Sequence, residues 1–285
     1  MNRYESTKKV SFLGIVGNIF LLVIKFIVAV FSHSEAMMAD AINSAGDIFS
    51  SIMSYIGNKI AGVPSDEDHN FGHGKAEYIF SLFIGMSMIA IAFKLLYDAI
   101  FSLINGNYFD FSWWLVGVCI ITIVIKLGLF IYANSISKKF DNLLLKSNLE
   151  DHRNDCIITS FTLISIFLSL LDIYWFDSVV SIGISIWIFY TGIKIFIESF
   201  NVLMDKSLDE KNSKKILELT SKYPEIQKVR HLNTTPVGYR YLVSLTIFVD
   251  GNLSTFESHR IADSLEKDLK KLDFVYLPII HVNPV

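Results

Sequence analysis

Five apolar stretches in this chain are each long enough to cross a membrane as a helix. They cover residues 10–31, 36–63, 78–104, 113–135 and 178–197. About 20 mainly apolar residues in a helix cross roughly 30 Å of hydrocarbon. Hydrophobic side chains make up 52% of the 285 residues, which is more than an ordinary soluble domain carries. The sequence therefore predicts a multi-pass α-helical membrane protein.

A sixth span is predicted around Asp151 and Asp155. The apolar run at residues 156–171 is too short to cross alone, and it reaches membrane length only if the helix begins near Asn148. That start places both aspartates inside the helix as it enters the membrane. We therefore expect six transmembrane helices.

Polar residues interrupt two of these spans in a regular pattern. Asp40, Asn43 and Asp47 share one helical face, and Asp151 and Asp155 lie one turn apart. An ionised carboxylate at membrane depth is costly unless a partner compensates it, and a divalent cation is a suitable partner. If the two helices face each other, Asn43, Asp47, Asp151 and Asp155 come within reach of one ion. All four would offer oxygen.

Four lysines also lie within predicted spans, namely Lys25, Lys94, Lys126 and Lys194. They either line a pathway, or snorkel to the interface or pair inside the bundle. The sequence leaves both interpretations open.

The positive charges outside these spans indicate the orientation of the chain. Loops 32–35, 105–110 and 172–177 contain no Lys or Arg. The opposite ends of the spans carry Arg3, Lys8, Lys9, Lys75, Lys138, Lys139 and Lys146. By the positive-inside rule, both termini are predicted to be cytoplasmic.

The composition becomes that of a soluble domain after the last span. A helix is expected at residues 208–222, strands at 229–234, 240–250 and 275–282, and a second helix after the capping-box pair Ser254 and Glu257. This αββαβ order predicts a small ferredoxin-like α+β domain. We therefore expect a transport domain at residues 1–204 and a regulatory and dimerisation domain at 205–285. The net charge of −3, without a long basic run, excludes a typical nucleic-acid binder.

Several features occur together in one protein family. They are the six spans, the paired acidic motifs in the second and fifth, the stretch FGHGKAE at residues 71–77, the sequence Ala-Asp-Ala at 39–41, and the C-terminal domain. The chain resembles the cation diffusion facilitator family over nearly its whole length. The resemblance implies a homodimeric transporter in the bacterial cell membrane. Such a transporter exports a divalent metal from the cytoplasm in exchange for protons by alternating access, and it is not an enzyme.

The resemblance also implies a central transport site formed by Asn43, Asp47, Asp151 and Asp155, with Asp40 on the pathway. Zinc-type members typically carry His at the position of Asn43, of Asp151, or of both, and this chain has His at neither. Oxygen ligands suit harder ions such as Mn²⁺, whereas zinc favours imidazole and thiolate. The chain also resembles the manganese-exporting bacterial members. Mn²⁺ is therefore the predicted substrate, with Fe²⁺ or Zn²⁺/Cd²⁺ as alternatives.

Three further groups match positions of known function in the family. Asp66, His69 and His73 match a peripheral metal site in the loop after the second span. The alternative is that His73 belongs only to the FGHGKAE turn and that His69 is solvated. Lys75 and Asp205 match a salt bridge that holds two protomers together, or form an inert exposed pair. His231, His259 and His281 match C-terminal metal ligands, but Leu245 and Asn283 replace others, so at most one weak regulatory ion is expected.

Two functions of other classes are alternatives to transport. A membrane-embedded metal-dependent hydrolase needs a general base and an open coordination position, and neither HExxH nor GxSxG occurs in the sequence. A membrane metal sensor that does not transport would share the ligands but carry no flux. The sequence favours the transporter and leaves the sensor as the alternative.

Overall fold

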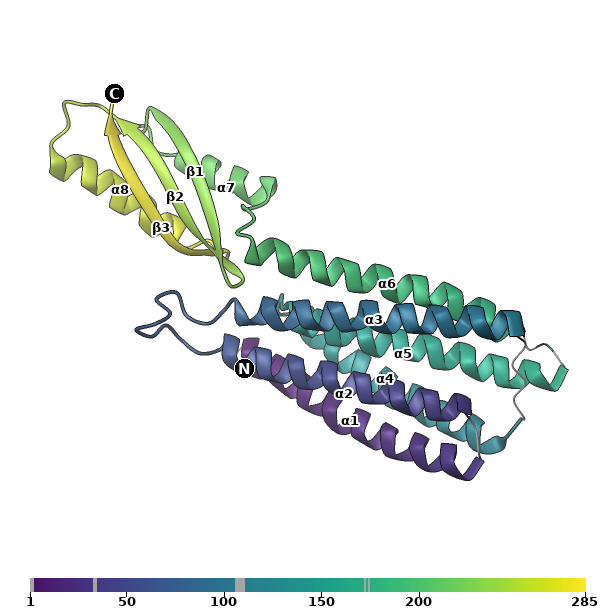
Figure 1. Cartoon of the computed structure of the whole chain (residues 1–285). Coiled ribbons are helices and arrows are strands. Elements are labelled where there is room, and N and C mark those ends of the chain that lie inside the picture. Colours follow the sequence, from purple (N-terminus) through teal and green to yellow (C-terminus); the bar gives the residue numbers. More distant parts are fainter. Residues whose placement is uncertain (1–2, 33–34, 106–110, 172, 174) are drawn as a thin grey trace. The chain divides into compact units, whose positions relative to one another are not determined.

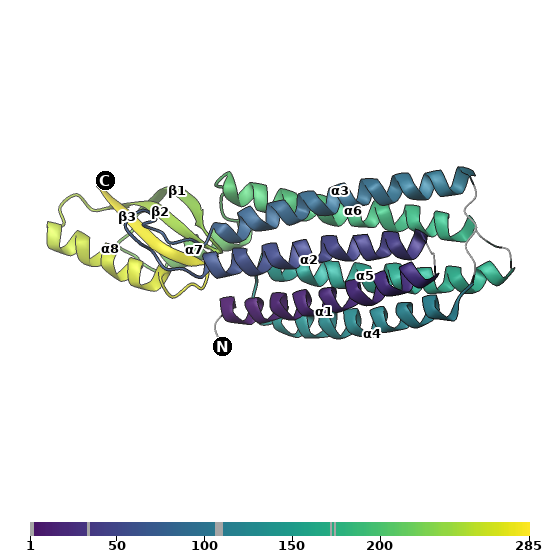
Figure 2. The same cartoon turned by 60° about the horizontal axis from the view of Figure 1, so that its bottom comes forward.

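The computed structural model describes residues 3–32, 35–105, 111–171, 173 and 175–285. Within this part, six long helices precede a domain of two helices and three strands (Figure 1). The long helices are α1 Arg3–Ser32, α2 Glu35–Ala61, α3 Ala76–Asn105, α4 Trp113–Ser137, α5 Leu143–Leu168 and α6 Trp175–Leu203. They run alongside one another in both views (Figures 1 and 2). A short 3₁₀ turn, η1 Ser169–Leu171, follows α5.

The outward faces of the long helices are apolar. Phe93 on α3, Val124 on α4 and Ile186 on α6 are 59%, 64% and 60% exposed. Large apolar surfaces of this kind need a non-aqueous surrounding. Among the described residues, α1, α3, α4 and α6 contain segments long and apolar enough to cross a membrane, whereas α2 and α5 carry the polar residues. The predicted multi-pass helical architecture is confirmed.

Helix α5 begins five residues before the predicted start at Asn148. Asn142 acts as its N-cap, because its side-chain oxygen accepts a hydrogen bond from Leu145 N at 2.9 Å. The buried carboxylate of Glu77, from α3, accepts another from Leu143 N at 2.6 Å. The carboxylate thus satisfies an amide that the helix itself leaves unpaired. Part of this cap comes from Glu77, which is distant in the sequence. The local sequence therefore predicted a start for this helix that was too late.

Small residues bring α3 and α6 close together. A Cβ added at Gly85 would lie 3.0 Å from Phe196 N and 3.1 Å from Gly192 O. Such close backbone approach through glycine is common between transmembrane helices. Ile84, Met88, Ile188 and other apolar residues complete this contact.

The C-terminal elements follow the predicted αββαβ order. They are α7 Glu210–Thr220, β1 Lys228–Val237, β2 Arg240–Val249, α8 Thr255–Leu269 and β3 Val275–Pro284. Strand β2 is central, antiparallel to β1 and parallel to β3. Its alternate residues Val243, Leu245, Ile247 and Val249 are buried in one core with residues of α7 and α8, so both helices cover the same face of the sheet. The Ser254 and Glu257 capping box is present.

The contacts divide the chain into two compact units. One comprises Met1–Val63 and Ala76–Phe200, and the other comprises Pro64–Lys75 and Asn201–Val285. The loop between α2 and α3 thus belongs with the C-terminal residues. In that unit, Phe71 lies edge-on to Tyr276 with ring centroids 6.2 Å apart, and Gly74 packs against Gly238.

Candidate metal centres

Three carboxylates from two helices meet at one cavity in the helical unit. Asp47 comes from α2, and Asp151 and Asp155 come from α5. The cavity has a volume of about 20 Å³, which is enough for one particle the size of a water molecule or a metal ion. Its remaining lining consists of Asn154 and the apolar side chains of Met88, Ile91, Leu95, Ile158 and Ile188. We call Asp47, Asp151 and Asp155 the three-carboxylate site.

A buried lysine reaches this site from α4. Lys126 Nζ donates a hydrogen bond to Asp47 Oδ2 at 2.9 Å and another to Asp155 Oδ2. The Lys126 side chain is only 1% exposed. A buried ion pair of this kind compensates charges that would otherwise be very costly at this depth. The sequence left two interpretations of Lys126 open, a pathway residue or a residue paired inside the bundle, and the structure shows the pairing. Its partners are two of the predicted metal ligands.

The other intramembrane lysines are placed differently. Lys25, on α1, is buried and donates a hydrogen bond to Ser44 at 3.0 Å. Lys94 is exposed and pairs with Asp98 one turn along α3, at 2.8 Å. Lys194 is exposed on α6.

His152, which was not predicted as a site residue, places an imidazole beside Asp151 and Asp155. It is fully buried, and neither ring nitrogen has a hydrogen-bond partner among the described residues. One ligand atom each from Asp151, His152 and Asp155 lie within 4.8 Å of one another. The signal was present in the sequence, because positions 148, 152 and 155 follow the i, i+4, i+7 spacing of one helical face.

The predicted fourth ligand, Asn43, and the pathway residue Asp40 lie on α2, but their side chains are outside the described part of the structure. The backbone places Asn43 one turn before Asp47, on the same helical face. Its role as a ligand therefore stays a prediction.

Ser51 and Ser54 lie on the same face of α2 as Asp47. They form hydrogen bonds with neighbouring helices and do not line the cavity. Ser54 Oγ lies 2.8 Å from Ser11 Oγ of α1 and also accepts from Asn148 of α5. Ser51 accepts from Asn18 of α1 at 3.3 Å. These bonds satisfy buried polar groups and fix α2 against α1 and α5, which positions the aspartates on α2 and α5.

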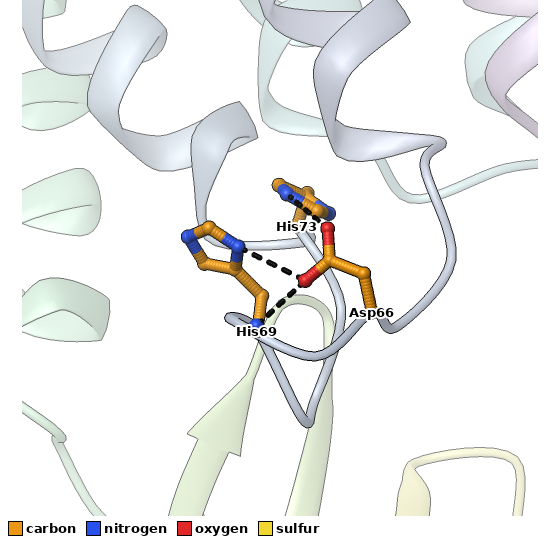
Figure 3. Close-up of side chains that lie close together, drawn as sticks. All are labelled: Asp66, His69 and His73. Carbon is orange, nitrogen blue, oxygen red and sulfur yellow. Dashed lines mark hydrogen bonds and ion pairs between the residues drawn. The ribbon is translucent and has the colours of Figure 1, made fainter.

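The loop residues Asp66, His69 and His73 form a second group, which we call the loop site (Figure 3). Asp66 Oδ1 accepts from His69 N at 2.7 Å and lies 3.2 Å from His69 Nδ1, while Asp66 Oδ2 lies 3.5 Å from His73 Nε2. The two imidazole rings are 4.3 Å apart. Hydrogen bonds from the His69 amide and ring, together with the charges of His69 and His73, hold the pKa of the Asp66 carboxyl below its usual range. The ligand atoms are thus close enough to share one ion.

The predicted ion pair between Lys75 and Asp205 is present within one chain. Lys75 Nζ lies 2.8 Å from Asp205 Oδ1, and both side chains are substantially exposed. Asp205 has a positive φ of 54° and ends α6 in a Schellman motif, with Lys206 N bonded to Asn201 O and Asp205 N bonded to Val202 O. The ion pair therefore involves a non-glycine residue in a left-handed helix cap.

The C-terminal histidines are spread over three elements. His231 on β1, His259 on α8 and His281 on β3 are all exposed. Among the described residues, the groups of three close ligands are the loop site and the one containing Asp151, and they include none of these histidines. His231, with φ 53°, lies where the register of β1 against β2 shifts, which is a β-bulge.

Comparison with known proteins agrees with this architecture. Residues 11–204 match the model of the cation efflux transmembrane domain, and residues 208–285 match that of the cytoplasmic domain of cation efflux proteins. An uncharacterized transporter, MJ0449, of Methanocaldococcus jannaschii is 30% identical over 99% of both chains. The manganese efflux system protein MneS of Bacillus subtilis is 27% identical over 100% of this chain and 99% of its own length. The cation-efflux pump FieF of Shewanella oneidensis is 27% identical over 93% of this chain and 90% of its own.

Matches of this extent cover both the helical bundle and the C-terminal domain, so they identify the whole chain and not a single module. The predicted resemblance to the cation diffusion facilitators is confirmed. The protein is a multi-pass membrane transporter and belongs to the cation efflux family.

Proposed function

We propose that this protein exports Mn²⁺ from the cytoplasm in exchange for protons. The observation that carries the proposal is the convergence of Asp47, Asp151 and Asp155 on one buried cavity. Three carboxylates at this depth are far too costly to retain as packing residues, and they match the charge and hardness of a divalent cation. Asn43, from the same face of α2, would complete an oxygen set. Two manganese efflux proteins of Bacillus subtilis are among the relatives, which supports the choice of metal.

Proton exchange follows from the chemistry of these ligands. A carboxylate binds metal only when it is deprotonated, so metal binding releases protons and protonation favours metal release. Asn43 does not titrate, which leaves Asp47, Asp151 and Asp155 to carry protons. Alternating access of the site to the two sides of the membrane would then couple the two fluxes.

We further propose that both termini are cytoplasmic and that two chains form a homodimer. The orientation is supported by the Lys and Arg distribution. Residues 1–204 would form the transport domain, and residues 205–285 would form a regulatory and dimerisation domain. The Lys75 to Asp205 pair would stabilise the unit through which the two chains associate.

His152 favours a second candidate substrate. An imidazole beside Asp151 and Asp155 provides nitrogen, which Fe²⁺ and Zn²⁺ accept more readily than Mn²⁺ does. Because Zn²⁺ binds most sites more tightly than Mn²⁺, binding affinity alone does not identify the exported metal. Transport has to be measured directly.

The test is flux into proteoliposomes that contain the purified full-length protein. Mn²⁺, Fe²⁺, Zn²⁺, Co²⁺ and Cd²⁺ are compared at equal free concentration, with and without an imposed pH gradient. We expect Mn²⁺ flux to be largest, to increase with the gradient and to return to its gradient-free level when a protonophore collapses the gradient. Flux of the same size with and without the pH gradient would exclude proton antiport. Metal binding without any flux would indicate a sensor instead.

The orientation is tested by cysteine labelling in a background without Cys119 and Cys156, which are the native thiols. Asn105→Cys, at the end of α3, should react with an impermeant maleimide outside intact cells. Ser137→Cys, at the end of α4, should react only after the membrane is opened. The reverse pattern would overturn the proposed orientation.

A further inference from the structure

We infer that Lys126 is a tethered competitor of the transported metal: its ammonium occupies the three-carboxylate site when no metal is bound, and a dication binds there by displacing it. This inference rests on the proposed function, since it concerns the same site. It starts from the fact that Lys126 Nζ contacts Asp47 and Asp155 at the same time. These are the carboxylates that a metal between α2 and α5 would need.

Electrostatics requires that the two cations compete. An ammonium and a dication bound to the same oxygens would lie a few ångströms apart in a medium of low dielectric constant, where repulsion between like charges is strong. Each carboxylate oxygen that accepts a hydrogen bond from Lys126 is also less available to a metal. Metal binding at Asp47 and Asp155 therefore weakens or breaks both contacts with Lys126.

The geometry leaves part of the site open to an incoming ion. Asp47, Asp151 and Asp155 line the cavity, whereas Lys126 is not among its lining residues. Asp151 Oδ2 is buried and has no hydrogen-bond partner among the described residues. An ion in the cavity can thus meet a ready oxygen on Asp151 before it displaces Lys126 from the other two aspartates.

Lys126 can move without unfolding α4. Its charge lies at the end of a flexible four-carbon stem. Thr122, one turn earlier on the same helical face, is buried, and its hydroxyl has no partner among the described residues. This hydroxyl offers an acceptor for the displaced ammonium.

The alternative is that Lys126 only holds the helices together. The two roles predict opposite signs for the effect of its removal. A purely structural lysine would leave a distorted site that binds metal more weakly. A competitor would leave a site of higher negative charge that binds metal more tightly.

The experiment measures Mn²⁺ binding to the purified full-length protein in lipid nanodiscs, from the electron paramagnetic resonance signal of free Mn²⁺, at pH 8 so that protons compete little. Lys126→Met removes the charge and keeps the length of the side chain. We expect it to bind Mn²⁺ at least tenfold more tightly than the parent. Lys126→Arg keeps the charge and should not bind Mn²⁺ more tightly than the parent, since a guanidinium also pairs with carboxylates. Lys94→Met, which removes an exposed lysine paired outside the site, should leave affinity unchanged.

Equal or weaker binding by Lys126→Met would overturn the inference. Asp151→Asn, made in the parent and in Lys126→Met, separates this failure from failure of the proposed function. If Asp151→Asn abolishes binding while Lys126→Met fails to tighten it, only the competitor role is wrong. If Asp151→Asn leaves Mn²⁺ binding intact in both backgrounds, the site itself is wrong and the inference falls with it.

A second measurement uses the unaltered protein, in case Lys126→Met does not fold. The ammonium signal of Lys126 is observed by ¹⁵N NMR after lysine labelling and is assigned by its absence in Lys126→Arg. Saturation with Cd²⁺, a diamagnetic dication, should shift this signal as the contacts to the carboxylates are lost. An unchanged signal at saturation would contradict displacement.

Discussion

The three-carboxylate site and the loop site both contain carboxylate groups that can bind a metal, but the first is buried and the second is exposed to solvent. Lys126 and the two aspartates it contacts are 1%, 6% and 12% exposed, whereas Asp66 and His69 are 48% and 57% exposed. In water, an unoccupied set of ligands costs little. Inside the bundle, unpaired carboxylates are expensive, and the protein provides a cation of its own. The comparison indicates that burial, more than ligand identity, decides which site depends on a bound cation.

The largest effect is expected from a neutral substitution in the buried site. Asp155→Asn keeps the shape of the side chain but removes one of three charges, and it should reduce Mn²⁺ flux in proteoliposomes by about 100-fold or more. Asp98→Asn, which neutralises an exposed aspartate of α3 paired with Lys94, is the matched control and should keep most of the flux. Comparable flux in the two variants would remove the contrast between buried and exposed carboxylates.

A smaller effect is expected from substitution of His152. It tests whether an imidazole contributes to metal selectivity in the buried site. His152→Asn removes the imidazole near Asp151 and Asp155. If the imidazole contributes to metal selectivity, binding of Zn²⁺ should weaken by about tenfold, and that of Mn²⁺ by less, because Zn²⁺ gains more from nitrogen ligands. Competitive titration of the two metals in nanodiscs measures the ratio. A ratio equal to the parent's would show that His152 does not contact the ion.

The loop site should respond more weakly still. His69→Ala with His73→Ala removes both imidazoles from an exposed group, and we expect metal bound in the loop to be lost while Mn²⁺ flux falls by less than about fivefold, since exposed ligands are not required to compensate buried charge. Equilibrium dialysis measures the number of metal ions bound per chain in the parent and in the variant, which tests this expectation. Loss of flux as complete as that of Asp155→Asn would make the loop a part of the transport path.

The pH dependence of loop binding provides a related test. Hydrogen bonds from His69 lower the pKa of Asp66, so this carboxylate contributes to loop stability above its ordinary pKa of 3.8, and the contribution is lost only as the pH falls through the lowered value. Asp66 is therefore ionised throughout the range from pH 5 to 8. Loss of metal from the loop in that range is therefore not caused by protonation of Asp66. Equilibrium dialysis at successive pH values should show the loss attributable to Asp66 only below its ordinary pKa of 3.8.

The smallest effect is expected from the exposed ion pair between Lys75 and Asp205. Lys75→Asp should lower the free energy of unfolding by about 1 kcal/mol or less, as for other surface ion pairs. Lys75→Asp with Asp205→Lys should recover part of this loss and, if the pair supports association, part of the dimer seen by light scattering. A double variant no better than either single variant would exclude a direct role for the pairing.

Several features of the site could be predicted because helical periodicity is local. The offsets of Asp47, Asp151 and Asp155, together with the cost of charge in a membrane, indicate which residues face one another. The alternation in β2 and the capping box of α8 were likewise readable, since each depends on neighbours a few residues away. His152 follows the same periodicity, four residues after Asn148 and three before Asp155, so its place beside the aspartates was also predictable.

What the sequence determined was the set of membrane helices, the order of the C-terminal elements and the charged residues that need partners. What only the tertiary structure decided was which partner each charge obtains. Lys126 is 79 residues from Asp47 and 29 from Asp155, so no local rule pairs them, whereas Lys94 pairs with Asp98 one turn along the same helix. Pairing at such separations is set by how helices pack, because the burial that makes a charge costly exists only after α2, α4 and α5 have come together.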